Sequence, residues 1–448
     1  MDKPICEYVR CYAERNAVRL HMPGHKGNAV LGVEHLDITE IDGADSLYEA
    51  NGIIRQSEEN AGRLFGCKTF FSTEGSSQCI RAMLCLAMLH AKGQGKQPLI
   101  AAARNVHKTF LSAVALLDLD VMWLYPNRTG SYLSCHISSE ELEAILSSAV
   151  QKPTALYITS PDYLGNLADV AGLAKVCLRY GILLIVDNAH GAYLRFLEPS
   201  LHPIDSGADL CCDSAHKTLP VLTGGAYLHL SPTVEDILTD QVKHALALFG
   251  STSPSYLILQ SLDNANVYLD SYREKLCNFQ VQVESLKTEL KTAGYCLTGQ
   301  EPLKITIATA SYGYTGTELA EILWEQNSVC EFADPDYLVL MLTPEISADE
   351  IRQLKNCLLA IPRKNPLALP QLSIHNGEKI LSVREAMFSP SEIIPVSESE
   401  GRILATPSVG CPPAVPILVC GERIDTCAIE SFSYYGIHEV TVVKAKTT

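Results

Sequence analysis

A lysine among polar residues, directly after a short apolar run, is the strongest chemical feature of this sequence. Leu210–Cys212 is typical of a buried strand, and Asp213-Ser214-Ala215-His216-Lys217-Thr218 follows it. Open α/β sheets bind their ligands at the carboxyl ends of strands, where Lys217 is therefore expected. A neutral amine at such a place is a nucleophile that can form a Schiff base with a carbonyl group. The alternative is an ordinary lysine in a solvated loop.

A carboxylate ends a second apolar run, thirty positions before Lys217. Ile182–Val186 leads into Asp187-Asn188-Ala189-His190-Gly191. The separation is about one strand-helix-strand unit, which would bring Asp187 and Lys217 to neighbouring strand ends. This pair indicates pyridoxal 5′-phosphate (PLP), because the cofactor withdraws electrons only while its pyridine nitrogen is protonated, and an acidic partner secures that proton. An N-cap residue or a metal ligand is the alternative interpretation of Asp187.

A phosphate-binding helix start is the third feature. Thr73-Glu74-Gly75-Ser76-Ser77 comes immediately before the helical stretch Gln78–His90. Small residues at a helix N-terminus offer backbone N–H groups and the positive end of the helix dipole to an anion. Plain helix capping by the same residue types is the alternative.

A histidine between an expected strand and an expected helix is the fourth feature. It is His107, in Asn105-Val106-His107-Lys108-Thr109. An imidazole at this place can stack on a cofactor ring. Taken alone, a histidine is as well explained by a structural role.

These residues need a scaffold of strands separated by helices, and the first two-thirds of the chain predict one. Val170–Tyr180 has the pattern of an amphipathic helix, with Asp169 as its N-cap and Gly181 after its last turn. Strands buried on both faces and separated by such helices predict a doubly wound, mostly parallel sheet. The expected strands are 99–102, 121–124, 155–159, 182–186, 210–212 and 226–230.

The rest of the chain predicts two further domains. A smaller α/β domain is expected at 267–361, with strands near 304–308 and 337–342. Each of these strands is followed by a capping box, Thr315-x-x-Glu318 and Ser347-x-x-Glu350. A proline-rich linker, 362–370, precedes a C-terminal α+β domain at 371–448. With an N-terminal arm at 1–30 and a large PLP-binding domain at 31–266, these blocks make up the expected organisation.

Composition excludes several classes of protein. The 448 residues are 47% hydrophobic and 19% charged, which is typical of a globular rather than a disordered chain. The formal net charge of −16 argues against a nucleic-acid partner. The sequence shows neither a signal peptide nor an apolar run long enough for a membrane span, so a cytoplasmic protein without a membrane partner is expected. Sixteen cysteines without a Cys-x-x-Cys pair do not predict a metal site.

Taken in order, these motifs resemble the Orn/Lys/Arg decarboxylase family of fold type I PLP enzymes, which have an aspartate-aminotransferase-like fold. The resemblance covers nearly the whole chain, and it rests on the shared order and spacing of the segments more than on any one of them. It is that of a short form without the amino-terminal wing domain. Besides the segments around His107, Asp187 and Lys217, it includes His21–Gly27, Leu47–Ile54, Gly250–Tyr256 and a proline-rich segment, Cys411–Pro416, that leads to Gly421-Glu422.

The resemblance implies a role for each site residue. Lys217 would carry PLP as a Schiff base, and Asp187 would bind the pyridine nitrogen. His107 would stack over the ring, and His190 would help to cover it. The residues implied near the phosphate are Ser214, His216, Gly75, Ser76 and Ser77, joined by Ser251 and Thr252 of a neighbouring subunit, which implies a homodimer with active sites at its interface.

The implied reaction is the alpha-decarboxylation of a basic amino acid, with arginine or lysine favoured over ornithine. His107, His216 and Lys217 are the expected catalytic residues, and either His216 or Lys217 would return a proton to the alpha carbon. Glu422 is a candidate for the substrate pocket, against the alternative of a surface glutamate. An aminotransferase or lyase of the same fold, or a PLP-binding paralogue without activity, stays open.

Two departures from the family pattern concern the cofactor site. Glu74 stands directly before Gly75-Ser76-Ser77, where the family often has Asn or Gln, and a carboxylate close to a phosphate is unfavourable unless it points away. Thr223-Gly224-Gly225 replaces a segment that commonly contains glutamine.

Overall fold

The chain forms two compact units, which are described one at a time. The computed structural model describes residues 1–125, 131–370, 372, 377–407 and 414–445. The first unit comprises 1–98, 145–157 and 169–277, and the second comprises 99–144, 158–168 and 278–448.

A seven-stranded sheet contains all six strands predicted for the first two-thirds of the chain, each within one residue of its expected ends. The strand order is β1-β7-β6-β5-β4-β2-β3. The pairs β5–β6 and β2–β3 are parallel, whereas β7 is antiparallel to both β6 and β1. The strands are β1 (Lys68–Ser72), β2 (Leu99–Ala103), β3 (Asp120–Leu124), β4 (Ala155–Thr159), β5 (Leu183–Asp187), β6 (Leu210–Asp213) and β7 (Ala226–Leu230).

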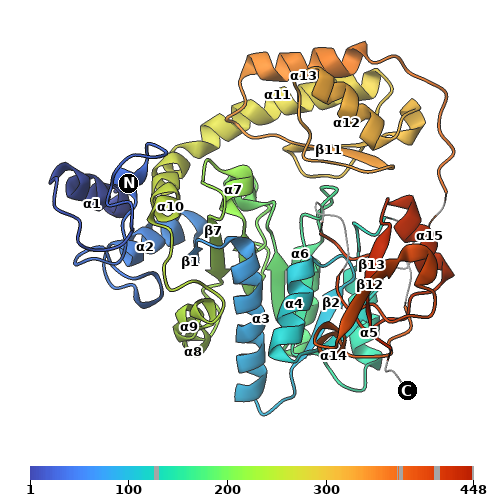
Figure 1. Ribbon diagram of the computed structural model, residues 1–448, viewed down its shortest axis with the longest axis horizontal. Coiled ribbons are helices and arrows are strands. Elements are labelled where there is room, and N and C mark those ends of the chain that lie inside the picture. Colours follow the sequence, from blue (N-terminus) through green and yellow to red (C-terminus); the bar gives the residue numbers. More distant parts are fainter. Residues whose placement is uncertain (126–130, 371, 373–376, 408–413, 446–448) are drawn as a thin grey trace. The chain divides into compact units, whose positions relative to one another are not determined.

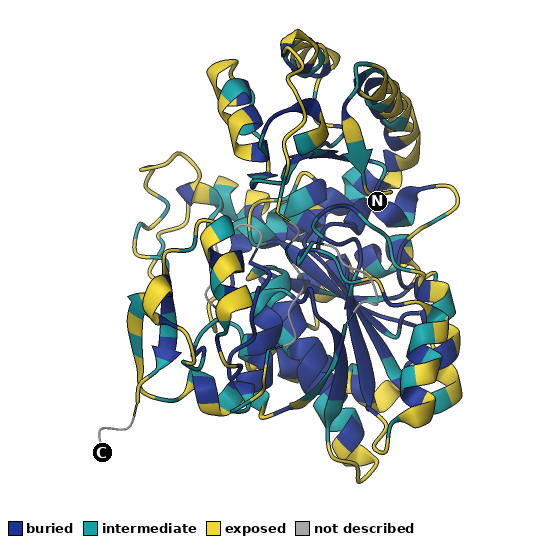
Figure 2. Ribbon diagram, turned by 90° about the vertical axis from the view of Figure 1, so that its right-hand side faces the viewer, coloured by how far each residue is buried: buried dark blue, intermediate teal, exposed yellow. Residues whose placement is uncertain are grey.

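Strand β1 is not among the strands expected from the sequence. It is a short stretch, and it pairs along its whole length with β7, from Lys68 opposite Leu230 to Ser72 opposite Ala226. All five residues of β7 and all four of β6 are buried, in keeping with strands covered on both faces. Figure 2 shows the centre of this sheet largely in dark blue, the colour of buried residues.

The helices begin and end where local chemistry allows. Helix α6 matches its predicted bounds: the Asp169 side chain accepts the N–H of Gly172, and Gly181 follows the last turn with φ +62°. The helices of the first unit are α1 (Pro4–Glu14), α2 (Ile53–Phe65), α3 (Gly75–Gly93), α6 (Val170–Tyr180), α7 (Ala215–Thr218), α8 (Asp236–Asp240), α9 (Val242–Ala247) and α10 (Tyr256–Asp270). Two helices, α5 (Ser139–Ser148) and α11 (Tyr272–Thr292), contribute residues to both units.

The second unit contains a four-stranded sheet with the order β10-β11-β9-β8, in which every pair is antiparallel. Both predicted capping boxes are confirmed, at Thr315–Glu318 before α12 and at Ser347–Glu350 before α13. The elements are β8 (Cys296–Thr298), β9 (Lys304–Ala308), α12 (Gly316–Glu325), β10 (Phe332–Ala333), β11 (Tyr337–Met341) and α13 (Ala348–Ala360); α4 (Lys108–Leu117) belongs to the same unit (Figure 1).

The C-terminal block of the second unit has a two-stranded antiparallel sheet of β12 and β13. Its core includes Leu404, Ile424, Phe432 and Val442. Residues 411–413 of the predicted proline-rich segment lie outside the described residues. Across the described ranges, no helix has both the length and the apolar character to cross a membrane. The elements of the block are α14 (Val383–Met387), β12 (Ser391–Pro395), α15 (Thr426–Tyr434) and β13 (Glu439–Val443).

Candidate functional site

Asp187 and Lys217 follow neighbouring parallel strands of the first unit. Asp187 is the last residue of β5 and lies opposite Cys212 of β6. Lys217 lies in the single turn of α7, which starts two residues after β6 ends. Its Nζ is 2.9 Å from Nε2 of His190. The strand-end geometry therefore brings together three residues that the sequence singles out.

The Asp187 carboxylate is buried and bound on both oxygens. The Tyr157 hydroxyl donates to Oδ2 at 3.0 Å, and the Ala189 N–H donates to Oδ1 at 3.2 Å. Burial raises the pKa of this carboxyl, while the positive charge of Lys217 and the hydrogen bond from Tyr157 act in the opposite direction. Tyr157 was missed in the sequence, where it reads only as one apolar residue of β4.

The start of α3 is arranged by two glycines. Gly75 has φ +72°, and its N–H donates to the carbonyl of Gly224 at 2.7 Å. Gly224 has φ +99°, and a Cβ on it would lie 2.9 Å from the Thr73 carbonyl oxygen. The Ser214 hydroxyl donates to Oγ of Ser76 at 2.7 Å, so this predicted phosphate residue lies against the α3 start. Ser77, also predicted, is the third residue of that helix.

Glu74 is engaged by the loop that contains Ser251. Its Oε1 accepts the N–H of Ser251 of the same chain. The carboxylate that departs from the family pattern is therefore bound by this loop. Oγ of Ser251 in turn accepts the N–H of Ser253. Ser251 and Thr252 are exposed in this chain.

His216 is held by its Nδ1 atom. Because a carbonyl only accepts, the contact of Nδ1 with the Gly225 carbonyl at 3.0 Å places the proton on Nδ1. Burial lowers the pKa of His216. The neutral ring therefore presents Nε2 as an acceptor.

His107 belongs to the second unit, where it caps helix α4. Its Nδ1 accepts the N–H of Thr109 at 3.2 Å, and Oγ1 of Thr109 lies 2.9 Å from the same atom. The structural interpretation of this histidine thus has direct support, and stacking on the cofactor stays a prediction.

Glu422, also in the second unit, is buried, so the alternative of a surface glutamate is wrong. Its Oε2 lies 3.1 Å from Nη2 of Arg104 and accepts the N–H of Val419 at 2.8 Å. Arg104 was missed in the sequence, although an arginine that ends the apolar run of β2 directly before Asn105 was a usable signal.

The donor set of the first unit fits PLP. A buried carboxylate stands ready for a protonated pyridine nitrogen, and a lysine interacts with it electrostatically. Serine hydroxyls meet the start of a long helix, whose N–H groups suit a phosphate. Oγ1 of Thr218, next to Lys217, is buried and has no hydrogen-bond partner among the described residues.

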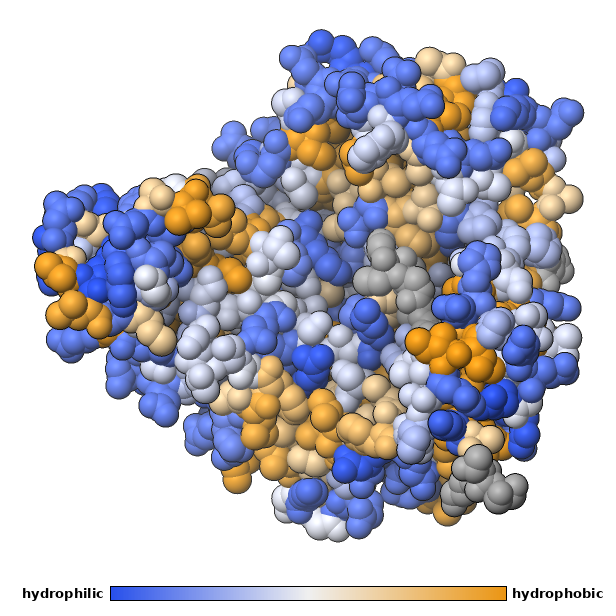
Figure 3. All heavy atoms as spheres, viewed as in Figure 1, coloured by the Kyte–Doolittle hydropathy of each residue, from blue (hydrophilic) through white to orange (hydrophobic). Residues whose placement is uncertain are grey.

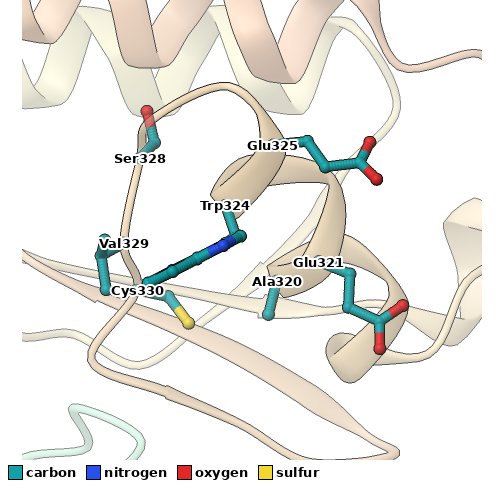
Figure 4. Close-up of a pocket in the computed structure, with 7 residues that line it drawn as sticks. All are labelled: Ala320, Glu321, Trp324, Glu325, Ser328, Val329 and Cys330. Carbon is teal, nitrogen blue, oxygen red and sulfur yellow. The ribbon is translucent and has the colours of Figure 1, made fainter.

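A pocket of the second unit is lined by residues that the sequence does not single out. It is formed beside α12 and has a volume of about 390 Å³. Trp324 and Val329 are 68% and 75% exposed there. None of the predicted site residues is part of its lining, which consists of Ala320, Glu321, Trp324, Glu325, Ser328, Val329 and Cys330 (Figure 4).

Comparison with known proteins agrees with this site. The family model described as Orn/Lys/Arg decarboxylase, major domain, matches residues 3–296. An arginine decarboxylase of Bacillus subtilis (strain 168) is 27% identical over 97% of this chain and 93% of its own length. The structure of lysine decarboxylase A from Pseudomonas aeruginosa has a TM-score of 0.81 at 18% identity, and the match covers 98% of this chain and 80% of that one.

A more distant solved structure carries the cofactor. It is a structure of SPT with PLP as an internal aldimine, with a TM-score of 0.56 at 13% identity over 80% of this chain and 83% of that one. Fold type I architecture, PLP as cofactor and amino-acid decarboxylation as the enzymatic activity follow from these matches. The chain belongs to the Orn/Lys/Arg decarboxylase family.

Proposed function

We propose that this enzyme removes the alpha-carboxylate of a basic amino acid, arginine or lysine in preference to ornithine, with PLP bound to Lys217. The observation that carries the proposal is the pairing of the buried Asp187 with Lys217 on adjacent strand ends. When bound, PLP supplies the electron sink that takes up the electrons of the breaking bond. Asp187, with Tyr157 behind it, would keep a proton on the pyridine nitrogen.

The phosphate group would lie at the start of α3, among Gly75, Ser76 and Ser77. Ser214 supports the proposal through its bond to Ser76, and the His216 ring lies close enough that a Cβ on Gly75 would be 4.0 Å from it. His190 contacts Lys217 and would help to cover the cofactor. We propose His107 as the residue that stacks over the ring.

We propose Lys217, rather than His216, as the group that returns a proton to the alpha carbon. The Nδ1 proton of His216 is committed to the Gly225 carbonyl, and its lowered pKa leaves Nε2 without a proton near neutral pH. The Lys217 amine, once released from the cofactor, is a proton carrier at the same strand end. His216 would then position the cofactor rather than donate.

Glu422 is proposed for the substrate pocket, and its ion pair with Arg104 permits a sharp test. If Glu422 binds the cationic side chain of the substrate, Glu422→Gln raises KM and leaves kcat nearly unchanged. If Glu422 only neutralises Arg104, the same variant loses thermal stability while KM stays at the wild-type value.

The decisive experiment incubates the PLP-loaded protein with arginine, lysine or ornithine and measures the amine product by mass spectrometry. Agmatine, cadaverine or putrescine, absent with Lys217→Ala, would establish the reaction and name the substrate. Cofactor trapped on Lys217 by borohydride, without any amine product, would contradict the proposal and return attention to an aminotransferase or a paralogue without activity.

We propose that the protein acts in the cytoplasm as a homodimer. The dimer is supported by the apolar surface of the N-terminal segment, where Val18, Leu20, Val30 and Leu31 are more than four-fifths exposed. The hydropathy surface in Figure 3 shows orange patches on the part of the protein that contains this segment, at the left of the view. A second copy of the chain would cover such a surface. A role of the amine product in polyamine synthesis belongs to the same proposal.

A further inference from the structure

A fully buried carboxylate of the first unit lies at the strand end that leads to Lys217. Asp213 is the last residue of β6, one position before Ser214, and it is fully buried. Its Oδ2 lies 3.1 Å from Nε2 of His202 and 3.2 Å from Nε2 of His229, both of which are also fully buried. Neither the sequence motifs nor the family resemblance predicts a role for any of these three residues.

The protons of this cluster can be placed from its contacts. Nδ1 of His202 accepts the N–H of Ile204 at 3.4 Å, so Nε2 carries the proton that is donated to Asp213. Burial lowers the pKa of His229, but Cys67 and Asp213 together raise it to about 10. The two histidines hold the pKa of Asp213 far below its usual range. Asp213 is therefore ionised and accepts a hydrogen bond from Nε2 of each histidine.

Hydrogen bonding rather than metal binding accounts for this cluster. Ligand atoms of His202, Cys211 and Asp213 lie within 4.8 Å of one another, a spacing that would suit a metal ion. A metal ligand needs a ring nitrogen with a free lone pair, whereas Nε2 of His202 bears the proton donated to Asp213. The second oxygen of Asp213 is also occupied, by an amide.

That amide is Asn188, the residue directly after Asp187. Its Nδ2 donates to Oδ1 of Asp213 at 2.7 Å, and its backbone N–H donates to the Cys212 carbonyl at 3.0 Å. Through Asp213, the end of β5 that carries Asp187 is therefore fastened to the end of β6 that leads to Lys217. The bond is charge-assisted and fully removed from water, which makes it both strong and directional.

We propose that Asp213 is a positioning residue of the cofactor site, which sets the placement of Asp187 relative to Lys217 through Asn188, and that His202 and His229 hold it in the ionised form this requires. The inference rests on the roles proposed above for Asp187 and Lys217. Asp213 would touch neither the substrate nor the cofactor. It acts only by holding Asn188.

A double-mutant cycle on PLP affinity tests the inference without relying on turnover. The Kd for PLP is measured by fluorescence for wild type, Asp213→Asn, Asn188→Ala and the double variant. Each single change should weaken PLP binding about tenfold or more, the value of one hydrogen bond to a charged group. Asn188→Ala removes the donor of the bond, and Asp213→Asn removes the charge of its acceptor. Since both changes act on the same bond, the double variant should bind PLP no more weakly than the weaker single variant.

Asp263→Asn is the matched control. Asp263 is another fully buried carboxylate of the first unit, and it accepts the Ser57 hydroxyl at 2.6 Å and the Ile5 N–H at 3.0 Å. Its loss should lower thermal stability but leave the Kd for PLP within about twofold, because among the described residues its hydrogen bonds go to Ser57, Ile5 and Cys6 and not to either strand end. Combined with Asn188→Ala, it should show additive effects.

Two results would overturn the inference. One is a wild-type Kd in Asp213→Asn, and the other is a double variant whose defects multiply. Should Asp213→Asn fail to fold, Asn188→Asp takes its place: a second carboxylate facing Asp213 should weaken PLP binding more than Asn188→Ala does, and equal Kd values would count against the proposal. Failure of the role proposed for Lys217 is distinguishable, because wild type would then show no borohydride-trapped PLP. Failure of the proposed decarboxylation alone would show as trapped PLP without amine product, and the Kd comparison would still stand.

Discussion

Burial works against the charge that Asp187 needs in order to hold a protonated pyridine nitrogen. Taking a carboxylate out of water raises its pKa, and here burial is the largest influence. Lys217, Tyr157 and the Ala189 N–H offset it within the first unit. At the scale of single residues, the cofactor site is therefore a balance between desolvation and a few well-placed partners.

Removing the Tyr157 hydroxyl should tilt this balance. Tyr157→Phe takes away one hydrogen bond to the carboxylate, so the pKa of Asp187 rises. The acid limb of the kcat pH profile should then move to higher pH by about one unit. The control is Tyr227→Phe, because the Tyr227 hydroxyl is buried and has no hydrogen-bond partner among the described residues. Equal profiles for Tyr157→Phe and wild type would contradict the assigned role.

The Asp213–His229 ion pair predicts a specific pH dependence of stability. The pKa of His229 is raised to about 10 in the folded protein, against about 6.5 when unfolded. Its contribution is complete below pH about 6.5 and is lost as the pH rises to about 10. The Tm difference between wild type and His229→Gln, measured without cofactor, should shrink over this range. Asp213, Cys67, His202 and Tyr227 are titratable groups that face the ring. A constant Tm difference over this pH range would argue against the pair.

At the scale of elements, the start of α3 depends on two glycines that bring the Thr73–Gly75 turn against the β7 side of the sheet. Gly224 approaches the Thr73 carbonyl oxygen too closely for a Cβ, and its positive φ strains any other residue. The phosphate-binding end of the helix is thus shaped by backbone contacts as well as by its serines.

Gly224→Ala should therefore destabilise the protein by about 1–3 kcal/mol and weaken PLP binding. Thermal unfolding and PLP titration measure both effects. Gly93→Ala, in the last position of α3, is the control, since a Cβ there meets nothing within 4 Å. Gly93→Ala should leave the Tm unchanged or slightly higher. A loss of PLP affinity in both variants would show that the effect does not come from the start of α3.

The turn between β10 and β11 contains a carboxyl that folding protonates. Oδ1 of Asp334 accepts the N–H groups of Asp336 and Tyr337, while burial and the nearby Asp336 raise the pKa of Asp334 to about 7. The folded state then holds a proton that the unfolded chain releases from pH about 4 upward, so stability falls as the pH rises to about 7.

Asp334→Asn keeps the acceptor for both N–H groups and removes the titration. Relative to wild type, the variant should gain stability between pH 4 and 8, at about 1.4 kcal/mol for each unit of pKa shift. Chemical unfolding at several pH values measures this. A pH-independent difference would show that Asp334 is not protonated in the folded state.

At the scale of the whole molecule, the open question is which chain supplies Ser251 and Thr252 to a given cofactor. Within one chain, Ser251 is already tied to the α3 start by Glu74. The proposed homodimer instead has both residues reach the phosphate of the neighbouring subunit. The two arrangements make opposite predictions for mixed dimers.

Mixing Lys217→Ala with the Ser251→Ala/Thr252→Ala double variant, and exchanging subunits, distinguishes them. If the neighbour contributes the hydroxyls, mixed dimers contain one intact site, and about a quarter of wild-type activity should return. If each chain serves its own cofactor, activity should stay at the level of the separate variants. Light scattering on the same samples gives the oligomeric state.

Local features of this protein were determined by the sequence alone. The six predicted strands, helix α6 with its Asp169 and Gly181 ends, and the capping boxes at Thr315 and Ser347 depend on residues a few positions apart. The pairing of Asp187 with Lys217 also followed from the sequence, because apolar runs mark both strands and their spacing fits neighbouring strand ends.

Tertiary structure decided the contacts that tune this site. In the sequence, Tyr157 is one residue of an expected strand, and Asp213 is the first residue of the Lys217 motif. Only the pairing of strands shows that Tyr157 binds Asp187 and that Asp213 binds Asn188. Glu422 meets Arg104 from 318 positions away, and Ser251 meets Glu74 from 177. Such contacts join residues whose local sequences are independent of one another, since only the folded chain brings them within hydrogen-bonding distance. At Glu422 and Arg104, folding also removes the water that would otherwise satisfy both groups.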